Sequence, residues 1–135
     1  MTPAQRAYFA GIIDGEGSIS LVRINKNSYP SPMISVASAD IELLEWLVKT
    51  SGCGSIISKK NYKPSQHKNS YALNITYNNA IRVLREIETY LVIDRKRKRA
   101  KHILENYLSV TPRNGRYSPE MLSKKERFYQ EFMSL

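Results

Sequence analysis

The sequence predicts an α+β domain in which helices cover one face of a four-stranded antiparallel sheet. Two pairs of short segments have the alternating apolar pattern of strands, and a helical pattern precedes each pair. Helical patterns then continue to the C-terminal end, so the expected order is α-β-β-α-β-β-α followed by further helices. With 135 residues and no linker-like segment, we expect one domain over residues 1–135.

The first helix is predicted from its start. Thr2 and Gln5 have the spacing of a capping box, and Pro3 between them is favoured at the first helical position. The helix is expected over residues 3–14, because Gly15 and a second glycine two residues later should stop it.

Residues 18–25 and 32–37 are the first predicted strand pair, joined by a polar turn. In the first strand Ile19 and Leu21 fall on one face, but Val22 and the isoleucine after Arg23 fall on the other. This pattern leaves two alternatives open: a bulge that shifts the frame, or a strand with both faces partly covered.

The remaining elements follow from the same signals. They are a helix over 40–50, strands over 55–60 and 70–77, helices over 78–90 and 94–108, and a last helix that opens at 118–120. Asn78 or Asn79 is expected to cap one of these helices and Asp94 another. Alternation in 32–37 and 70–77 gives the sheet an apolar inner face and a polar, basic outer face.

Composition excludes several classes of protein. The chain has 21 Lys and Arg against 12 Asp and Glu, for a formal net charge of +9, so a polyanion is the expected partner. Cys53 is the only cysteine, which excludes a disulfide framework, and the two histidines lack metal-ligand spacing. No membrane span or signal peptide is apparent. We therefore expect an intracellular protein that acts where it is synthesised, in the cytoplasm or in an organelle.

The positive charge is unevenly distributed. Residues 17–39 and 52–78 contain no Asp or Glu, while Lys and Arg alternate there with Asn and Tyr. Such a surface meets phosphate with little repulsion. Residues 95–101 hold six cations in seven positions, and a solvated face or a localisation tract accounts for such a run as well as a contact with a polyanion does.

The first helix has two unlike faces. Small residues at Ala7, Ala10 and Gly11 share one arc with Asp14, and bulky ones fill the opposite arc (Tyr8, Phe9, Ile12 and Ile13). The bulky arc is expected in the core. The small arc favours close approach by another helix, because a glycine inside a helix costs about 1 kcal/mol relative to alanine.

The end of this helix breaks a local rule. Asp14 and Glu16 lie where the helix dipole disfavours anions, and Glu16 stands between two glycines. A bound divalent cation such as Mg²⁺ would account for carboxylates in that position. A plain polar turn of the form Asp-Gly-Glu-Gly accounts for the same four residues.

Residues 9–17 read Phe-Ala-Gly-Ile-Ile-Asp-Gly-Glu-Gly. This run resembles the LAGLIDADG motif of homing endonucleases, whose close variants include Phe in the first position and Gly-Glu-Gly at the end. Residues 39–47 with the Gly-x-Gly turn at 52–54 resemble the helix and turn that follow the family's first hairpin, and residues 93–100 resemble its Lys-rich segment. The resemblance extends in outline over about residues 3–135.

The resemblance implies a site-specific endonuclease that hydrolyses double-stranded DNA with a divalent metal, Mg²⁺ or Mn²⁺. Glu16 would be catalytic and bind the metal, with the backbone carbonyl of Gly15 as a further ligand. Asp14 would support catalysis. Aligning Ala100 with the family's alanine makes Lys96 the catalytic lysine.

Two positions stay open in this alignment. A small shift would move the role of Lys96 to Lys98 or Arg95. Ser38 stands where some members have a glutamine that positions water, and it could equally be a helix cap.

By the same resemblance, the outer sheet face and its loops would contact DNA. Side chains expected to reach base edges are Arg23 (subject to the unresolved frame), Lys26, Tyr29, Ser31, Ser35, Lys59, Asn61, Ser70 and Asn74. Those expected at phosphates are Lys63, Lys68 and Lys98. Cleavage would be staggered, with 3′ overhangs.

The chain has room for one motif, whereas cutting both strands of a duplex calls for two catalytic sites. We therefore expect the single-motif, homodimeric type, with Ala7, Ala10 and Gly11 at the interface and a long pseudo-palindromic target. The alternatives are a catalytically silent DNA- or RNA-binding relative, such as an intron-splicing maturase, and a basic RNA-associated protein with a chance motif.

Overall fold

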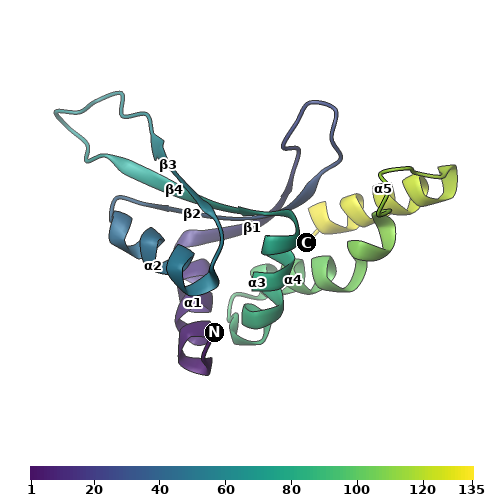
Figure 1. Cartoon of the computed structure of the whole chain (residues 1–135), viewed down its shortest axis with the longest axis horizontal. Coiled ribbons are helices and arrows are strands. Elements are labelled where there is room, and N and C mark those ends of the chain that lie inside the picture. The colour runs from purple at the N-terminus through teal and green to yellow at the C-terminus, as the bar shows by residue number, and fades with distance from the viewer.

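The computed structural model describes all 135 residues, and the expected order of elements is confirmed. In Figure 1 a curved sheet lies above the helices, and a hairpin loop rises from each of its two ends. The elements are α1 Pro3–Glu16, β1 Gly17–Val22, β2 Ser31–Ser38, α2 Ile41–Ser51, β3 Ser55–Lys59, β4 Ser70–Thr76, α3 Tyr77–Ile87, η1 Glu88–Tyr90, α4 Asp94–Asn106, η2 Leu108–Val110 and α5 Pro119–Met133.

The four strands form one antiparallel sheet in the order β1-β2-β4-β3. The pairing of β1 with β2 runs without a bulge from Gly17 opposite Val36 to Val22 opposite Ser31. The open question about β1 is thereby answered in favour of the second alternative. The strand has no bulge, Ile19 and Leu21 are buried, and Ser20 and Val22 on the other face are half-buried.

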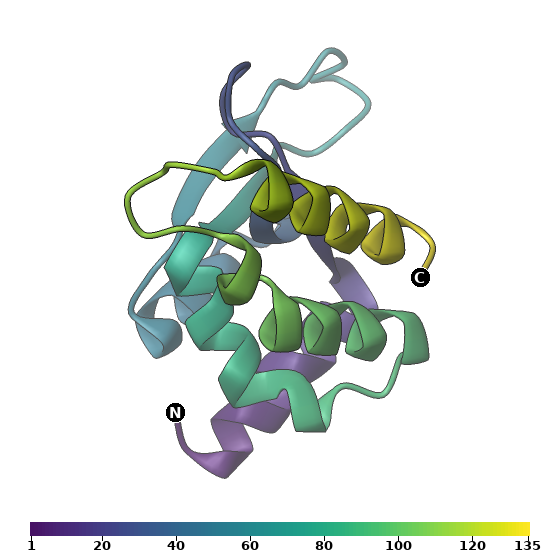
Figure 2. The same cartoon turned by 90° about the vertical axis from the view of Figure 1, so that its right-hand side faces the viewer.

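The core lies between the inner sheet face and the helices. Ile34, Val36, Leu73 and Ile75 are at most 1% exposed, as the alternation predicted. Figure 2 shows α5 crossing in front of the β1 end of the sheet, with α4 beneath it. None of the helices combines the length and the apolarity needed to cross a membrane.

Helix α1 does not stop at Asp14 but continues through Gly15 to Glu16. The N–H of Gly17 donates to the carbonyl of Ile13 and closes the last turn. A Cβ on Gly17 would lie 2.9 Å from the Cα of Ile13, so only glycine lets β1 leave the helix at this point. For this steric reason the strand can begin at Gly17, the last residue of the motif.

Two of the expected helix caps are wrong. The chain passes from β4 into α3 without a loop, and α3 begins at Tyr77, whose φ is +53°, before either asparagine can cap it. Asp94 is the first residue of α4 and not its cap. By contrast, Ser118 caps α5 through a bond from the N–H of Met121, and the first helix has its predicted cap.

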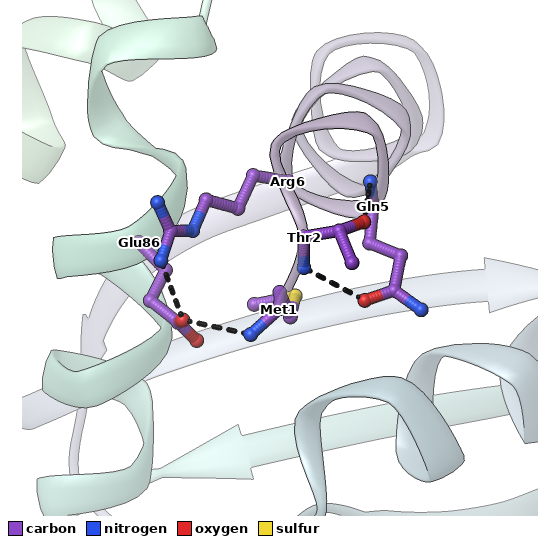
Figure 3. Close-up of polar contacts among 5 residues, drawn as sticks. All are labelled: Met1, Thr2, Gln5, Arg6 and Glu86. Carbon is purple, nitrogen blue, oxygen red and sulfur yellow. Dashed lines mark hydrogen bonds and ion pairs between the residues drawn. The ribbon is translucent and has the colours of Figure 1, made fainter.

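Figure 3 shows how the N-terminus is held. Thr2 and Gln5 form the reciprocal capping box, with bonds of 2.9 and 3.1 Å. The amino group of Met1 and the guanidinium of Arg6 both reach the Glu86 Oε1 atom, at 3.1 and 3.5 Å. Helix α1 is therefore tied to α3 at the end remote from the motif carboxylates.

Candidate active site and nucleic-acid surface

Glu16 is the last residue of α1, and its side chain is exposed. Its carboxylate has no hydrogen bond or ion pair within the chain, unlike that of Asp14. It lines a surface hollow of about 450 Å³ together with Ser38, Asp40 and Ser70. An unpartnered carboxylate at the negative end of a helix is unfavourable unless a cation or a donor meets it there.

Asp14 joins the end of α1 to the start of α4. Its Oδ2 accepts from the N–H of Val92 at 2.9 Å, and its Oδ1 accepts from the N–H of Ile93 at 3.1 Å. These donors precede the first turn of α4, where N–H groups lack helical partners. Both carboxylate oxygens are therefore engaged in fixing the position of the motif.

Lys96 makes the opposite connection. Its Nζ donates to the carbonyls of Ile13 and Asp14 at 2.8 and 2.7 Å. These oxygens lie in the last turn of α1, where a positive charge also offsets the helix dipole. Asp14 and Lys96 thus bind the two helix ends reciprocally, and Lys96 is brought to the end of the motif, two positions before Glu16.

The other cations of the basic run have different surroundings. Lys98 donates to Asp94 at 2.9 Å, and the pKa of the Asp94 carboxyl lies below its ordinary value mainly because of this hydrogen bond. Arg99 turns inward, donates to the carbonyl of Ile19 at 3.3 Å, and has its pKa lowered mainly by burial. Arg95 is exposed and touches no carbonyl of the motif. Of the three candidates, Lys96 alone contacts α1.

These contacts predict different results for two single substitutions. Lys96→Ala removes the bonds to α1 and the cation beside the motif, so we expect a large fall in cleavage rate with little loss of DNA affinity. Hydrogen bonds of this charged kind contribute roughly 1.5–3 kcal/mol, so a measurable loss of unfolding free energy should accompany it. Lys98→Ala should mainly weaken binding, as one share of the salt-dependent affinity. Single-turnover cleavage and equilibrium titration of both variants check this, and exchanged behaviours would contradict the alignment.

The exposed face of α1 differs from the predicted one. Ala10 is 0% exposed within the protomer, so its assignment to a dimer interface is wrong. Tyr8, expected in the core, is 56% exposed and packs edge-on against Trp46 with ring centroids 4.8 Å apart. Ala10 belongs to the hydrophobic core together with Phe9 and Ile13, whereas Ala7 and Gly11 are exposed.

Glycine at two positions of α1 is not required by the protomer. A Cβ on Gly11 or Gly15 would meet no atom within 4 Å. Both residues are exposed and share a face with Ala7 and Tyr8. Alanine would be more favourable than glycine in a helix, so packing within the protomer does not account for glycine at these two positions.

The outer face of the sheet is polar, as predicted, but most of its cations lie at its ends. The Oγ of Ser35 donates to the Oδ1 of Asn74 at 3.0 Å, across the pairing of β2 with β4. Exposed lysines occur at Lys59 and in the loops, such as Lys26 between β1 and β2. The β3–β4 loop contains a hollow of about 330 Å³ lined by Lys60, Asn61, Tyr62, Lys63, His67, Lys68 and Ser70.

Four predicted base contacts have other surroundings. Ser31 is 2% exposed and donates to the carbonyl of Val22, so its prediction as a DNA contact is wrong. Arg23 lies in the loop, not in β1, and donates to the carbonyl of Ser28 at 3.0 Å. Asn61 uses its amide inside its own loop, where it donates to the carbonyl of His67 at 2.8 Å. Tyr29 packs on Tyr117 of the segment before α5.

Lys60 and Tyr62 lie in the basic segment 52–78 but are not among the predicted DNA contacts. The Nζ of Lys60 lies 5.0 Å from the ring centroid of Tyr62, which is 80% exposed. Their alternation of basic and aromatic residues is the same signal that selected the neighbouring lysines, and it would have included them.

Comparison with known proteins decides the class. A sequence model of the LAGLIDADG endonuclease family matches residues 9–107, which include the C-terminal part of α1, the whole sheet and α4. The chain belongs to the LAGLIDADG endonuclease family. The motif residues Asp14 and Glu16, and Lys96 in α4, all fall within the matched region.

Solved structures of homing endonucleases share the fold. The homing endonuclease I-CvuI, in complex with its target, has 19% sequence identity and a TM-score of 0.75 over 97% of this chain and 81% of its own. The homing endonuclease I-TnaI has 22% sequence identity and a TM-score of 0.66, and the match covers 93% of this chain and 86% of that one. The archaeal intron-encoded homing endonuclease I-Vdi141I, complexed with DNA, has 17% sequence identity and a TM-score of 0.63. The match covers 99% of this chain and 85% of that one. No curated protein sequence matches the chain.

Proposed function

We propose that this LAGLIDADG chain is a site-specific endonuclease that cuts double-stranded DNA as a homodimer, with a divalent metal at Glu16. The target would be long and pseudo-palindromic, and the cut staggered with 3′ overhangs. One observation carries the proposal: α1 ends at Glu16, an exposed carboxylate without a partner, and a reciprocal pair of contacts from Asp14 and Lys96 holds this helix end in place.

The residues at this helix end fit a hard divalent cation. Glu16 and the carbonyl of Gly15 offer oxygen donors, which Mg²⁺ and Mn²⁺ prefer. One protomer contains no group of three or more His, Cys, Asp or Glu side chains that could hold a metal by itself. Phosphate oxygens, water and the Glu16 of a second copy would therefore complete the set.

When bound there, the metal would supply Lewis-acid activation of the scissile phosphate and of the attacking water. The protein positions these reactants. Asp14 and Lys96 hold the end of α1 against α4, so that Glu16 is presented at a fixed place. The ammonium of Lys96 lies beside the same helix end and can neutralise charge that develops on the phosphate.

DNA would lie across the outer sheet face. Its neutral polar rows, such as Ser35 with Asn74, can exchange hydrogen bonds with base edges in the major groove. The two hairpin loops rise at opposite ends of the sheet, and their lysines would contact phosphates on either side (Figure 1). This arrangement separates base reading at the centre from charge neutralisation at the ends.

A homodimer would form through the exposed face of α1. Ala7 and Gly11 allow two such helices to approach about a twofold axis, which would bring the two Glu16 side chains together. Tyr8 and Trp46 extend this face as an exposed apolar contact. Each catalytic glutamate would then serve one DNA strand.

A cleavage selection tests the whole proposal. The protein is incubated with a duplex library randomised in sequence, with Mg²⁺ or with EDTA, and the cut ends are sequenced. We expect enrichment of one pseudo-palindromic site with 3′ overhangs in Mg²⁺ alone. Absence of any Mg²⁺-dependent cutting at micromolar protein would contradict the proposed activity.

A further inference from the structure

A lysine is buried where the β1–β2 loop meets α5. Lys125 is 5% exposed and has no carboxylate partner. Its Nζ donates to the Oγ1 of Thr111 at 3.0 Å and to the hydroxyl of Tyr117 at 2.6 Å. Burying an ammonium without a counter-ion is costly, so a position that served packing alone would be better filled by leucine or methionine.

Three tyrosine rings surround this ammonium. The Nζ of Lys125 lies 4.9 Å from the ring centroid of Tyr107, 5.0 Å from that of Tyr117 and 5.6 Å from that of Tyr29. A cation over an aromatic face is attracted by the ring electrons, and more strongly where water is excluded. Burial still lowers the pKa of Lys125 to about 8. The rings come from three separate parts of the chain, which the lysine joins.

Tyr29 is the member that belongs to the DNA-facing loop. The hydrogen bonds of residues 23–30 stay within that segment, for example from Ser28 N–H to the Asn25 carbonyl at 3.1 Å. Outside it, the Tyr29 ring packs against Tyr117, with centroids 4.7 Å apart. A small hollow of about 130 Å³ lies between this loop and α5 and is lined by Arg23, Tyr29, Pro30, Leu122, Lys125, Glu126 and Tyr129.

We propose that Lys125 is a positioning residue for DNA recognition: it anchors Tyr29 to α5 and so presents the β1–β2 loop to DNA in one arrangement. This inference rests on the proposed DNA-binding function of the outer face. Lys125 itself is too buried to contact DNA. Its effect is exerted through the loop that carries Arg23 and Lys26.

The first test needs no DNA. Lys125→Met keeps the length and apolar stem of the side chain and removes the charge and both hydrogen bonds. Hydrogen exchange of the free protein should show faster exchange in residues 23–30, with the strands β2 and β4 unchanged. Lys124→Met, an exposed neighbour paired with Glu120, is the matched control and should leave the loop unaffected. Lys125→Arg, which restores a cation, should recover part of the protection.

The second test uses a duplex that the wild-type protein cleaves. Lys125→Met should raise the apparent Kd several-fold while leaving the single-turnover rate at saturating DNA unchanged. The salt dependence of binding should keep its slope, because no phosphate contact is lost, whereas Lys26→Ala should lower that slope by about one. If the wild type neither cleaves nor binds any duplex, the proposed function fails. The hydrogen-exchange result would still test whether Lys125 holds the β1–β2 loop.

A variant on the opposite side of the contact distinguishes the proposed effect from a general folding defect. Tyr29→Leu should reproduce the loop exchange and the weaker binding, and the double variant should be no worse than either single one. Unchanged exchange of residues 23–30 in Lys125→Met would overturn the proposal. So would faster exchange across the whole chain without a matching effect of Tyr29→Leu.

Discussion

Glu16→Gln is expected to lower the rate of DNA cleavage by orders of magnitude while DNA binding persists. The amide keeps the size of the side chain but lacks the charge that recruits a divalent cation. The carboxylate of Glu16 is exposed and has no partner in the chain, so the substitution removes no contact that holds the fold. Single-turnover cleavage in Mg²⁺ and titration in Ca²⁺ or EDTA measure the two effects separately.

The matched control is Glu105→Gln, which removes the same charge from an exposed, unpaired position on α4. It should cleave like the wild type. Cleavage by Glu16→Gln within a few-fold of that control would remove Glu16 from the site, whatever the family motif implies.

Gly11→Leu is expected to abolish double-strand cleavage by preventing dimer formation. Within the protomer the new side chain meets open space, because nothing lies within 4 Å of a Cβ at this position. The monomer should therefore fold at least as stably as the wild type, since leucine favours a helix over glycine by several tenths of a kcal/mol. Between two closely packed helices, however, it would overfill the contact. Sedimentation velocity and thermal unfolding report the two properties.

Two comparisons sharpen this result. Ser123→Leu adds the same side chain to an exposed position on α5 and should leave assembly and cleavage intact. Gly11→Ala should give an intermediate loss of dimer. A Gly11→Leu protein that sediments as a monomer at micromolar concentration and still makes concerted double-strand breaks would refute the assembly.

Local signals were sufficient for the framework and for the position of the motif. The capping box around Pro3, the alternation in β2 and β4, and the turn at Gly52 each depend on residues within one element or next to it. The nine-residue motif identifies Glu16, and the alignment through Ala100 identifies Lys96. The structure adds that Lys96 reaches α1, which spacing alone left open between three cations.

The errors arose where tertiary packing decides. A helical wheel groups Ala10 with Gly11, but it cannot tell that the core covers Ala10 and leaves Gly11 exposed. Ser31 has the parity of an outer residue, yet its position at the base of the hairpin buries it. Lys125 gave no sequence signal, because its surroundings come from segments far apart in the chain.

Helix α1 carries both the exposed small residues and, at its last position, Glu16. If the same helix makes the contact between copies and completes the site, a lone protomer has only half of the required carboxylates. The initial cleavage rate should then rise with the square of the protein concentration below the dimer Kd. At low expression the protein would stay monomeric and would not cut genomic DNA. Cleavage activity would then appear over a narrow range of protein concentration.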